Sequence, residues 1–443
     1  MSNLNIIYGF LLILFNFSGI TQTWSPVGGG TNGNIRALEK HNNKLYIGGS
    51  FSTAGSISSN NIASWDGLIW DSLGSGFSSV GSVACLHSTF NGLFVGGSFN
   101  TVGNLQSSSG GGIALWENSN WYWVGGGVVS FSPYNPGSVN SISFYNNQLY
   151  IGGRFLTAGG STIPNIAKWN GSFWSGLTSA TTQSVVLAMA EYNNELYVGG
   201  SFTSAGGVTA NHIAKWNGTS WSIIGSGAND IVYCFLVYNG QLYVGGNFSN
   251  INGISANKIA KWNGTNWAPV GSGTNDNVYA LAVYNGELYA GGSFTQAGGN
   301  PAKHIAKWDG ANWLPLGIGT DTSVYALTAY QGDLYVGGMF TSAGGSPTNY
   351  IAKWNNPIGI KDLEINYQIN VYPNPATDKI WIEQNKKDIK IEEIVLIDAY
   401  GTEHKTFMKN KNEVDISTLN SGVYILILNT NKGLLRKKFI ISR

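Results

Sequence analysis

Short apolar runs and turn signals alternate along most of the chain. Between residues 278 and 317, four such runs are separated by Gly-rich, Asn-Gly and Asp-Gly turns. The runs are Val278–Tyr284, Glu287–Phe294, His304–Trp308 and Trp313–Gly317. Runs of this length and punctuation predict β-strands. Asn285-Gly286, between the first two runs, is typical of a hairpin turn in which both central residues have positive φ. The pattern therefore predicts a unit of four antiparallel strands.

This four-strand unit occurs seven times. A Gly-Gly pair that ends its second strand recurs at intervals of 46 to 56 residues. The first glycines of the pairs are Gly48, Gly96, Gly152, Gly199, Gly245, Gly291 and Gly337. Two tryptophan columns accompany the pair and hold 14 of the 16 tryptophans, all except Trp123 and Trp381. Four-stranded units repeated at this period predict a β-propeller, in which the units are blades around an axis.

The phase of the repeat predicts how the ring closes. The seventh copy ends at Trp354 without a fourth strand, and the chain has a spare strand at Trp24–Gly28. Pairing these segments removes two exposed sheet edges. We therefore expect an all-β chain whose residues 24–356 form a seven-bladed β-propeller with four-stranded blades, closed by the N-terminal strand. Inner strands crowd around the axis, so each carries a small residue such as Ala37 or Cys85, and the second copy is expected to need a one-residue bulge.

The unit resembles the kelch repeat, in which a strand ends in Gly-Gly and a tryptophan follows in an outer strand. Leu196–Gly200, Trp216 and Trp221 occupy those positions here, and the likeness extends over residues 24–354. Trp216 stands where kelch units more often carry tyrosine. The kelch-like resemblance implies a propeller fold and leaves the function open, because one fold can serve both binding and catalysis.

The N-terminal segment predicts export. Ile6–Phe17 is an apolar run too short to cross a bilayer, and small or polar residues follow it as far as Thr23. This pattern is typical of a signal peptide at residues 1–23, although Met1–Asn5 contains no Lys or Arg. The alternative is a buried N-terminal strand.

The composition changes sharply near Pro357. Residues 24–356 contain 23 charged side chains, and the last 87 residues contain 24. We expect a linker at 357–366 and a small β-sandwich at 367–443. Three motifs in this segment, Val371–Ala376, Ser421–Tyr424 and Lys437–Ile441, resemble in their order the C-terminal sorting domain of the type IX secretion pathway of Bacteroidota. An ordinary immunoglobulin-like module is the alternative.

The resemblance to sorting domains implies a route, a partner and a set of residues. The sorting motif would consist of Pro373, Asn374, Pro375, Gly422, Tyr424, Lys437 and Lys438. The route would be Sec export to the periplasm, passage through the outer membrane by the type IX secretion machinery, and release or attachment at the cell surface. The sorting domain itself would usually be removed.

Candidate chemistry is sparse. Five histidines are scattered, and His212 and His304 occupy equivalent repeat positions. No His, Cys, Asp or Glu group has metal-ligand spacing, and Cys85 and Cys234 are expected to be free thiols in distant inner strands. The net charge of +1 favours neither nucleic acid nor an anionic membrane as partner. We predict no catalytic or metal site, no cofactor and no transmembrane anchor, and a monomer fits the sequence.

A column of lysines precedes the first tryptophan column in five copies. Its members are Lys168, Lys215, Lys261, Lys307 and Lys353. The column is either an anion-binding ring or the solvated side of outer strands, where lysine discourages edge pairing. The second interpretation is favoured, because outer-strand lysines spread around the perimeter.

Ligand binding is expected on the face opposite the Asn-Gly turns, where longer connections such as 203–211 lie. Residues 125–138 depart from the repeat length there, and Phe131 and Tyr134 are the predicted ligand-binding residues. A tolerated insertion is the alternative. We predict a secreted or cell-surface binding or adhesion propeller for an unknown extracellular glycan or protein. The rival is an extracellular carbohydrate-active enzyme, a lyase or hydrolase, although the loops are mostly Gly, Ser, Thr, Asn and Ala.

Overall fold

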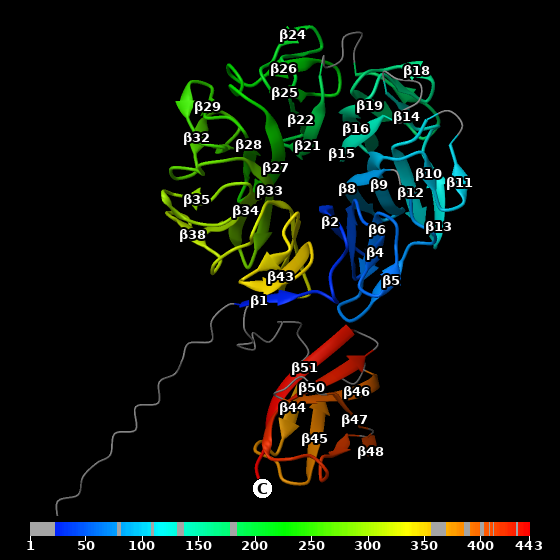
Figure 1. Cartoon of the computed structure of the whole chain (residues 1–443), viewed down its shortest axis with the longest axis vertical. Helices are drawn as coiled ribbons and strands as arrows, with labels where there is room; N and C mark the ends of the chain where they lie inside the picture. Colours follow the sequence, from blue (N-terminus) through cyan, green and yellow to red (C-terminus); the bar gives the residue numbers. More distant parts are fainter. Residues whose placement is uncertain are drawn as a thin grey trace, which may run out of the picture. The chain divides into compact units, whose positions relative to one another are not determined.

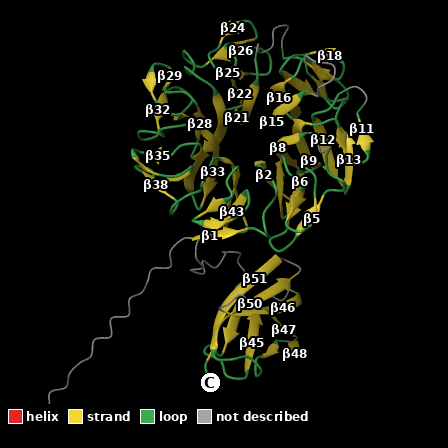
Figure 2. Ribbon diagram, viewed as in Figure 1, coloured by secondary structure: helices red, strands yellow, loops and turns green. Residues whose placement is uncertain are grey.

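The computed structural model describes residues 23–77, 81–107, 110–130, 137–177, 184–355, 369–384, 390–398, 403–406, 408–410, 412–430 and 433–443. These residues form 51 strands and no helix, which confirms the all-β prediction (Figure 2). Accordingly, none of the described segments is a helix able to cross a membrane. The chain divides into two compact units between Pro357 and Ile358. The predicted signal peptide, except Thr23, and the predicted linker lie outside the described residues.

The first unit contains seven four-stranded antiparallel sheets, which we number 1 to 7 in the chain order of their inner strands. From inner to outer strand, sheet 1 contains β2 Ile35–His41, β3 Lys44–Gly49, β6 Ile62–Trp65 and β7 Trp70–Ser72. Sheet 2 contains β8 Ser82–Thr89, β9 Gly92–Ser98, β12 Ile113–Glu117 and β13 Asn120–Trp123. Sheet 3 contains β15 Ser138–Tyr145, β16 Gln148–Arg154, β19 Ile166–Trp169 and β20 Trp174–Ser175. Sheets 4 and 5 are β21 Val186–Tyr192, β22 Glu195–Gly200, β25 Ile213–Trp216 and β26 Trp221–Ile223; and β27 Val232–Tyr238, β28 Gln241–Gly246, β31 Ile259–Trp262 and β32 Trp267–Pro269. Sheets 6 and 7 are β33 Val278–Tyr284, β34 Glu287–Gly292, β37 Ile305–Trp308 and β38 Trp313–Pro315; and β39 Val324–Tyr330, β40 Asp333–Gly338, β43 Ile351–Asn355 and β1 Thr23–Pro26.

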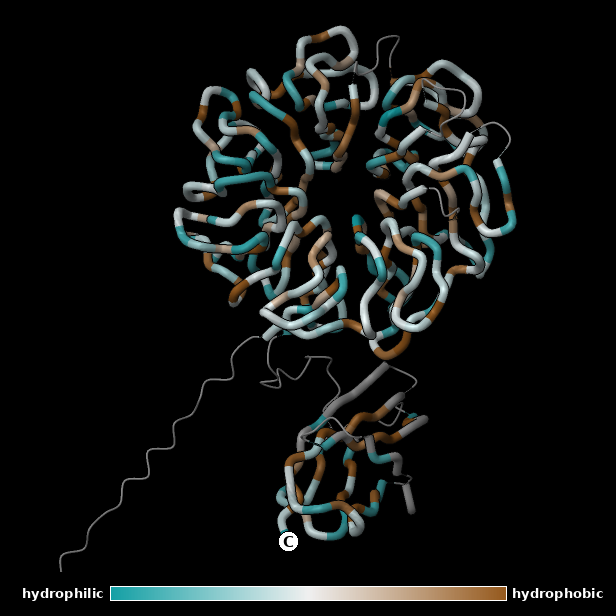
Figure 3. The backbone as a smooth tube through the Cα atoms, in the orientation of Figure 1, coloured by the Kyte–Doolittle hydropathy of each residue, from teal (hydrophilic) through white to brown (hydrophobic). Residues whose placement is uncertain are grey.

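The sheets lie side by side around a common centre, with their first strands innermost (Figure 1). Each inner strand contacts the inner strand of the next sheet, and β39 of sheet 7 contacts β2 of sheet 1. Figure 3 shows hydrophobic stretches throughout this arrangement, separated by hydrophilic turns. The apolar side chains therefore pack mainly between neighbouring sheets, as the clusters shared by consecutive sheets indicate.

The N-terminal strand β1 occupies the outer position of sheet 7. It pairs antiparallel with β43, where Trp24 lies opposite Trp354 and the two rings are 5.2 Å apart. Nε1 of Trp24 donates a hydrogen bond to the carbonyl of Leu316 at 3.0 Å. Trp70 of sheet 1 makes the equivalent bond to Gly28, also at 3.0 Å. Trp24 thus has the same kind of polar partner as the outer tryptophan Trp70, although Trp24 is half-buried and Trp70 is buried.

The Gly-Gly pair allows the inner strands to approach closely. A Cβ on the first glycine would collide with a branched side chain of the following sheet, as Gly291 would with Val324 at 2.5 Å. Gly337 of sheet 7 meets Ile35 of sheet 1 in the same way, at 2.6 Å. A Cβ on the second glycine of a pair would overlap a backbone carbonyl of its own sheet. Both positions therefore require a residue without a side chain.

A β-bulge occurs in every inner strand. In sheet 6 the register shifts between Val278 and Ala280, and the other six sheets shift at the equivalent place. The small residue consequently faces the first glycine in all seven sheets, as Ala280 faces Gly291. The bulge predicted in the second copy is present, and the other six copies have one as well, because the crowding around the axis is common to all copies. Cys85 and Cys234 occupy two of these small-residue positions and are free thiols, as predicted.

The first hairpin of sheet 2 differs from the sequence prediction. Thr89 pairs with Gly92, so Phe90 and Asn91 form the turn and Gly92 belongs to the strand. The Asn-Gly dipeptide suggested a turn one residue later. In this copy the turn contains Phe90, whose side chain is almost fully exposed.

The connections between second and third strands are small ribbons, whereas the sequence suggested plain loops. Their strands have only two residues, too few for a periodic signal. The ribbons are β4 Thr53–Ala54 with β5 Ile57–Ser58, β10 Thr101–Val102 with β11 Leu105–Gln106, β17 Thr157–Ala158 with β18 Ser161–Thr162 and β14 Val128–Val129, β23 Ser204–Ala205 with β24 Val208–Thr209, β29 Asn250–Ile251 with β30 Ile254–Ser255, β35 Gln296–Ala297 with β36 Asn300–Pro301, and β41 Ser342–Ala343 with β42 Ser346–Pro347. Oδ1 of Asn275 accepts hydrogen bonds from the N–H groups of Thr295 and Gln296, both at 2.9 Å, and so ties one ribbon to the preceding loop. Asn32, Asn229 and Asp321 make equivalent pairs of bonds.

The second unit consists of two four-stranded sheets. One contains β44 Ile369–Tyr372, β45 Lys379–Gln384, β49 Glu413–Asp415 and β48 Met408–Asn410, and the other contains β47 Glu403–Thr406, β46 Ile391–Asp398, β50 Gly422–Thr430 and β51 Gly433–Ile441. Ile380 and Val414 of the first sheet and Leu396 and Leu426 of the second are fully buried in one apolar cluster. Two sheets that share one core in this way form a β-sandwich.

Candidate functional sites

The three predicted sorting motifs meet at β51, the last strand. Oδ1 of Asn374 accepts a hydrogen bond from the backbone N–H of Ile440 at 2.9 Å. The N–H of Ala376 donates to the carbonyl of Ile440 at 2.7 Å, so the first motif is held against the third. The second motif pairs with the same strand, where Tyr424 faces Phe439. The structure thus brings together motifs that are as many as 66 residues apart in the chain.

The sorting residues divide into an exposed group and a structural group. Pro373, Asn374 and Pro375 are exposed, and Gly422 is half-buried. Tyr424 is buried, its ring stacks on Phe439 at 5.9 Å, and its hydroxyl donates to the carbonyl of Asn420 at 3.1 Å. On β51, Lys437 faces Leu426 and Lys438 faces Ile425 of β50. Tyr424 therefore supports the sandwich, and the Pro-Asn-Pro segment is the part that a partner can reach.

Arg443 belongs to the same assembly, and sequence reasoning missed it. Its guanidinium donates to the carbonyls of Ile416 at 2.8 Å and Thr377 at 3.2 Å, and its backbone N–H donates to Oγ of Ser421 at 3.1 Å. These bonds join the end of the chain to three other segments of the sandwich. A single basic residue after β51 has no periodic or spacing signal that could have indicated this role.

The predicted ligand-binding residues Phe131 and Tyr134 lie outside the described residues. The segments on either side of them belong to sheets 2 and 3, and Gly125 accepts a hydrogen bond from Nε1 of Trp174 at 3.1 Å. Their role in binding stays a prediction.

Three members of the lysine column are paired with a carboxylate in their own sheet. Nζ of Lys215 is 2.7 Å from Glu195, Nζ of Lys307 is 3.0 Å from Glu287, and Nζ of Lys353 is 2.9 Å from Asp333. These pairs neutralise most of the charge that an anion-binding ring would need. The other two lysines lack this acid. Gln148 occupies its position beside Lys168, and Gln241 occupies it beside Lys261. Within the described ranges neither lysine has a carboxylate partner.

Tyrosines fasten neighbouring sheets on the side of the Asn-Gly turns. The hydroxyl of the last tyrosine of an inner strand donates to a turn carbonyl of the next sheet. The pairs are Tyr145–Asn194, Tyr192–Gly240, Tyr238–Gly286, Tyr284–Gly332 and Tyr330–Asn43, with distances of 2.6 to 3.0 Å. The last pair joins sheet 7 to sheet 1, so the first and last sheets are linked by the same kind of hydrogen bond as the other pairs.

A second group of tyrosines lines the opposite end of the inner strands. The rings of Tyr233 and Tyr279 are 5.1 Å apart, and those of Tyr279 and Tyr325 are 5.4 Å apart. The guanidinium of Arg36, which is exposed, lies 5.7 Å from the ring of Tyr325. This half-buried aromatic arc occurs only in sheets 5 to 7 among the described residues and gives one side of the centre a surface suited to contact with a ligand.

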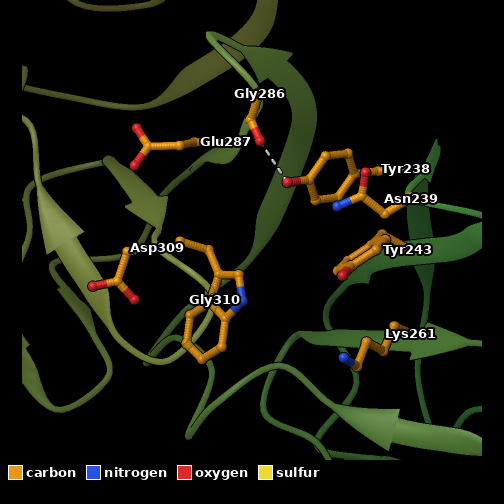
Figure 4. Close-up of a pocket in the computed structure, with 9 residues that line it drawn as sticks. Tyr238, Asn239, Tyr243, Lys261, Gly286, Glu287, Asp309 and Gly310 are labelled. Carbon is orange, nitrogen blue, oxygen red and sulfur yellow. Dashed lines mark hydrogen bonds between the residues drawn. The ribbon is translucent and has the colours of Figure 1, made fainter.

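A cavity of about 320 Å³ lies between sheets 5 and 6 (Figure 4). It is lined by Tyr238, Asn239, Tyr243 and Lys261 of sheet 5 and by Gly286, Glu287, Trp308, Asp309 and Gly310 of sheet 6. At the equivalent place between sheets 4 and 5, Nε1 of Trp262 donates to the hydroxyl of Tyr197 at 3.2 Å. The corresponding pair here is Trp308 and Tyr243, and neither forms a hydrogen bond with a described residue. The hydrogen bond that joins sheets 4 and 5 is thus missing at this cavity.

The charges around the cavity are separated. Figure 4 shows the ammonium of Lys261 and the carboxylate of Asp309 on opposite sides. Asp309 accepts hydrogen bonds from the N–H groups of Asn312 at 2.6 Å and Ala311 at 2.8 Å, which hold the pKa of this exposed carboxyl below its usual value. Glu287 is paired with Lys307. Lys261 is therefore the cation of the cavity that has no partner among the described residues.

The closest approach to a catalytic arrangement lies between sheets 1 and 2. Nδ1 of His41 is 2.9 Å from Oγ of Ser88, and Nε2 of His41 is 3.0 Å from the amide nitrogen of Asn42. Because that amide nitrogen can only donate, Nε2 accepts and the ring proton sits on Nδ1, which donates to Ser88. Burial also lowers the pKa of His41, so the ring stays neutral. A histidine that donates to a serine cannot act as its base, and in the described residues no three His, Cys, Asp or Glu side chains are grouped as a metal site would require.

Glu39 on the same inner strand makes the stability of the protein depend on pH. Burial raises the pKa of its carboxyl from 4.5 to about 7. The folded protein therefore holds this proton more tightly than the unfolded chain, and the resulting stability is present below pH 4.5 and is lost as the pH rises through 7. The Glu39→Gln variant should be more stable than the parent by up to about 3 kcal/mol at mildly alkaline pH, and the gain should shrink on acidification.

Thermal unfolding at mildly acidic and mildly alkaline pH measures this difference. Glu191→Gln is the matched control, because Glu191 is an exposed residue of another inner strand and its substitution should show no such pH-dependent gain. A gain for Glu39→Gln that is the same at both pH values would contradict the assignment.

Two family matches correspond to the two units of the chain. Residues 370–442 match the secretion system C-terminal sorting domain. Residues 193–218 and 239–264 match a β-propeller domain of unknown function, DUF5122. No curated protein sequence matches the chain.

Solved structures similar to the chain include a β-propeller domain, an extracellular domain and a designed protein. The extracellular domain of a hybrid two-component system of B. thetaiotaomicron is 11% identical with a TM-score of 0.50, and the match covers 95% of this chain and 58% of that one. The WD40 β-propeller domain of Doa1 is 14% identical with a TM-score of 0.45, covering 73% and 93%. The computationally designed Ika8 protein is 16% identical with a TM-score of 0.45, covering 74% and 97%. The chain therefore carries a β-propeller domain followed by a type IX secretion C-terminal sorting domain.

Proposed function

We propose that the chain is an extracellular binding protein, a closed seven-bladed kelch-like propeller that the type IX machinery of a Bacteroidota-type cell delivers to the surface or the medium. The observation that carries this proposal is the sorting domain at residues 370–442, whose exposed Pro373–Pro375 segment is held in place by the last strand. A sorting tail has a use only on a protein that works outside the cell. The signal peptide at residues 1–23 and a glycan or protein ligand belong to the same proposal.

Three contacts support a closed ring of seven blades. β1 pairs with β43, the inner strands of sheets 7 and 1 touch, and the hydroxyl of Tyr330 reaches the carbonyl of Asn43 at 2.7 Å. Each of these contacts joins the start of the first unit to its end. A ring of this kind presents fixed loops, which are common places for binding.

Binding is favoured over catalysis by the chemistry of the described residues. The lysine and carboxylate column is mostly ion-paired, and the His41–Ser88 pair has the wrong proton position for a nucleophile and its base. Aromatic groups, by contrast, lie half-buried in the arc Tyr233, Tyr279 and Tyr325 and around the cavity between sheets 5 and 6. Half-buried aromatic rings supply contact area at low entropic cost.

Export is tested by removing the sorting domain. A variant without residues 367–443 should accumulate in the periplasm of the native host, because the segment that the type IX machinery recognises is gone. Cell fractionation and immunoblotting measure the distribution. A variant without residues 2–23 is the control and should remain in the cytoplasm. Appearance of the truncated propeller in the medium or on the surface at the parental level would refute the proposed route.

A further inference from the structure

The cavity between sheets 5 and 6 lacks two polar contacts that other sheets have. Lys261 lacks the acidic partner that Lys215 and Lys307 have. Trp308 and Tyr243 lack the indole-to-hydroxyl bond that joins Trp262 and Tyr197. Three donors around one space, on Lys261, Tyr243 and Trp308, therefore have no hydrogen-bond partner among the described residues and are available to a ligand.

The unused groups define the chemistry of a ligand. The ammonium of Lys261, the hydroxyl of Tyr243 and the indole N–H of Trp308 are donors on the lining of a single cavity. Figure 4 shows Tyr243 and Lys261 side by side on one wall. One positive charge with two neutral donors suits a singly charged carboxylate, whereas a phosphate dianion would call for more cations.

The rest of the lining suits a hydroxylated ring. Tyr238 and Trp308 contribute aromatic side chains to a lining that is mostly polar, and Asp309 and Asn239 contribute polar groups. The volume of about 320 Å³ is at the small end of the range for ligand pockets and accommodates one ring with its substituents. A purely apolar acid would leave the polar edge without partners.

We propose that this cavity binds a carboxylated sugar residue, the unit of an acidic polysaccharide, with its carboxylate at Lys261, Tyr243 and Trp308 and its hydroxyls toward Asp309 and Asn239. The inference rests on the proposed extracellular binding function and names a ligand class and a site for it. An acidic polysaccharide is an extracellular ligand that presents many copies of this unit.

Titration calorimetry of the secreted chain, residues 24–443, tests the proposal with three probes: a galacturonic acid trimer, its methyl ester and a neutral galactose trimer. The acid trimer should bind, and the two uncharged probes should bind at least tenfold more weakly. Lys261→Met keeps the aliphatic stem and should reduce binding of the acid at least tenfold. Tyr243→Phe removes only a hydroxyl and should reduce it severalfold.

Lys168→Met is the matched control. Lys168 belongs to the same column and also lacks an acid, but Trp216, which occupies the place of Trp308 in the neighbouring sheet, is only 1% exposed and is not accessible to a ligand. This variant should bind like the parent, and thermal unfolding should show that all variants are folded. Equal binding of the acid and its ester, no binding of the acid, or parental affinity in Lys261→Met would overturn the assignment. The export test of the sorting-domain deletion does not depend on the cavity. A failure of the cavity proposal can therefore be told apart from a failure of the proposed function.

Discussion

Deletion of residues 24–30 is expected to lower the melting temperature by about 10 °C or more, because it removes a whole strand and the buried Val27. The deletion also exposes the edge of β43 and uncovers Trp354, which is 4% exposed in the intact chain. Sheet 7 then has only the three strands that the end of the repeat supplies. Differential scanning calorimetry of the secreted chain with and without this segment measures the effect.

Two further samples make this test specific. Trp24→Ala should cost about 2–3 kcal/mol, less than for a core tryptophan, because the structure shows Trp24 half-buried. Tyr122→Ala, in the outer strand β13, should cost much less, since Tyr122 is 48% exposed. A synthetic peptide of residues 23–30 added to the deletion variant should restore part of the stability. An unchanged melting temperature would mean that β1 does not hold sheet 7.

Gly292→Ala is expected to destabilise the protein by about 3 kcal/mol or more, the upper range for overpacking. The added Cβ would overlap the carbonyl oxygen of Asn277, which is backbone and cannot move aside without displacing the start of β33. Urea unfolding of the secreted chain measures the change in free energy. The equivalent glycines Gly49, Gly97, Gly153, Gly200, Gly246 and Gly338 meet a backbone carbonyl in the same way.

Gly286→Asn is the matched control for this substitution. Gly286 has a φ of +75° in the hairpin turn of the same sheet, and no atom lies within 4 Å of its added Cβ. Asn occupies the corresponding position in three other sheets, at Asn43, Asn147 and Asn194, with φ of 57 to 59°. The control should therefore unfold within about 0.5 kcal/mol of the parent. Equal stabilities for Gly292→Ala and Gly286→Asn would show that the close approach at Gly292 is not required.

The features that depend on local pattern could be predicted from the order of residues. The β-strands of the repeat follow from short apolar runs and Asn-Gly turns. Trp24 could be paired with Trp354 because the repeat begins with a spare fourth strand and its last copy lacks one. The sorting motifs could be recognised because their residues are contiguous along the chain. These signals are one-dimensional, so they are readable without knowledge of which segments touch.

The features that depend on contact between distant segments could not be predicted and became visible in the fold. The sequence shows that Gly-Gly recurs, but not why. In sheet 6 the reason is that Val324 lies close to the first glycine and the carbonyl of Asn277 lies close to the second, and both belong to other segments of the chain. The two-residue ribbons were missed because they are too short for a periodic signal and because the hydrogen bonds that tie one of them down come from Asn275, a loop residue 20 positions earlier. The lysine column had two interpretations. The structure shows that Lys307 is paired with a carboxylate, whereas Lys261 has no such partner among the described residues. The missing bond between Trp308 and Tyr243 could not be predicted either, because the same two residue types do form it between sheets 4 and 5.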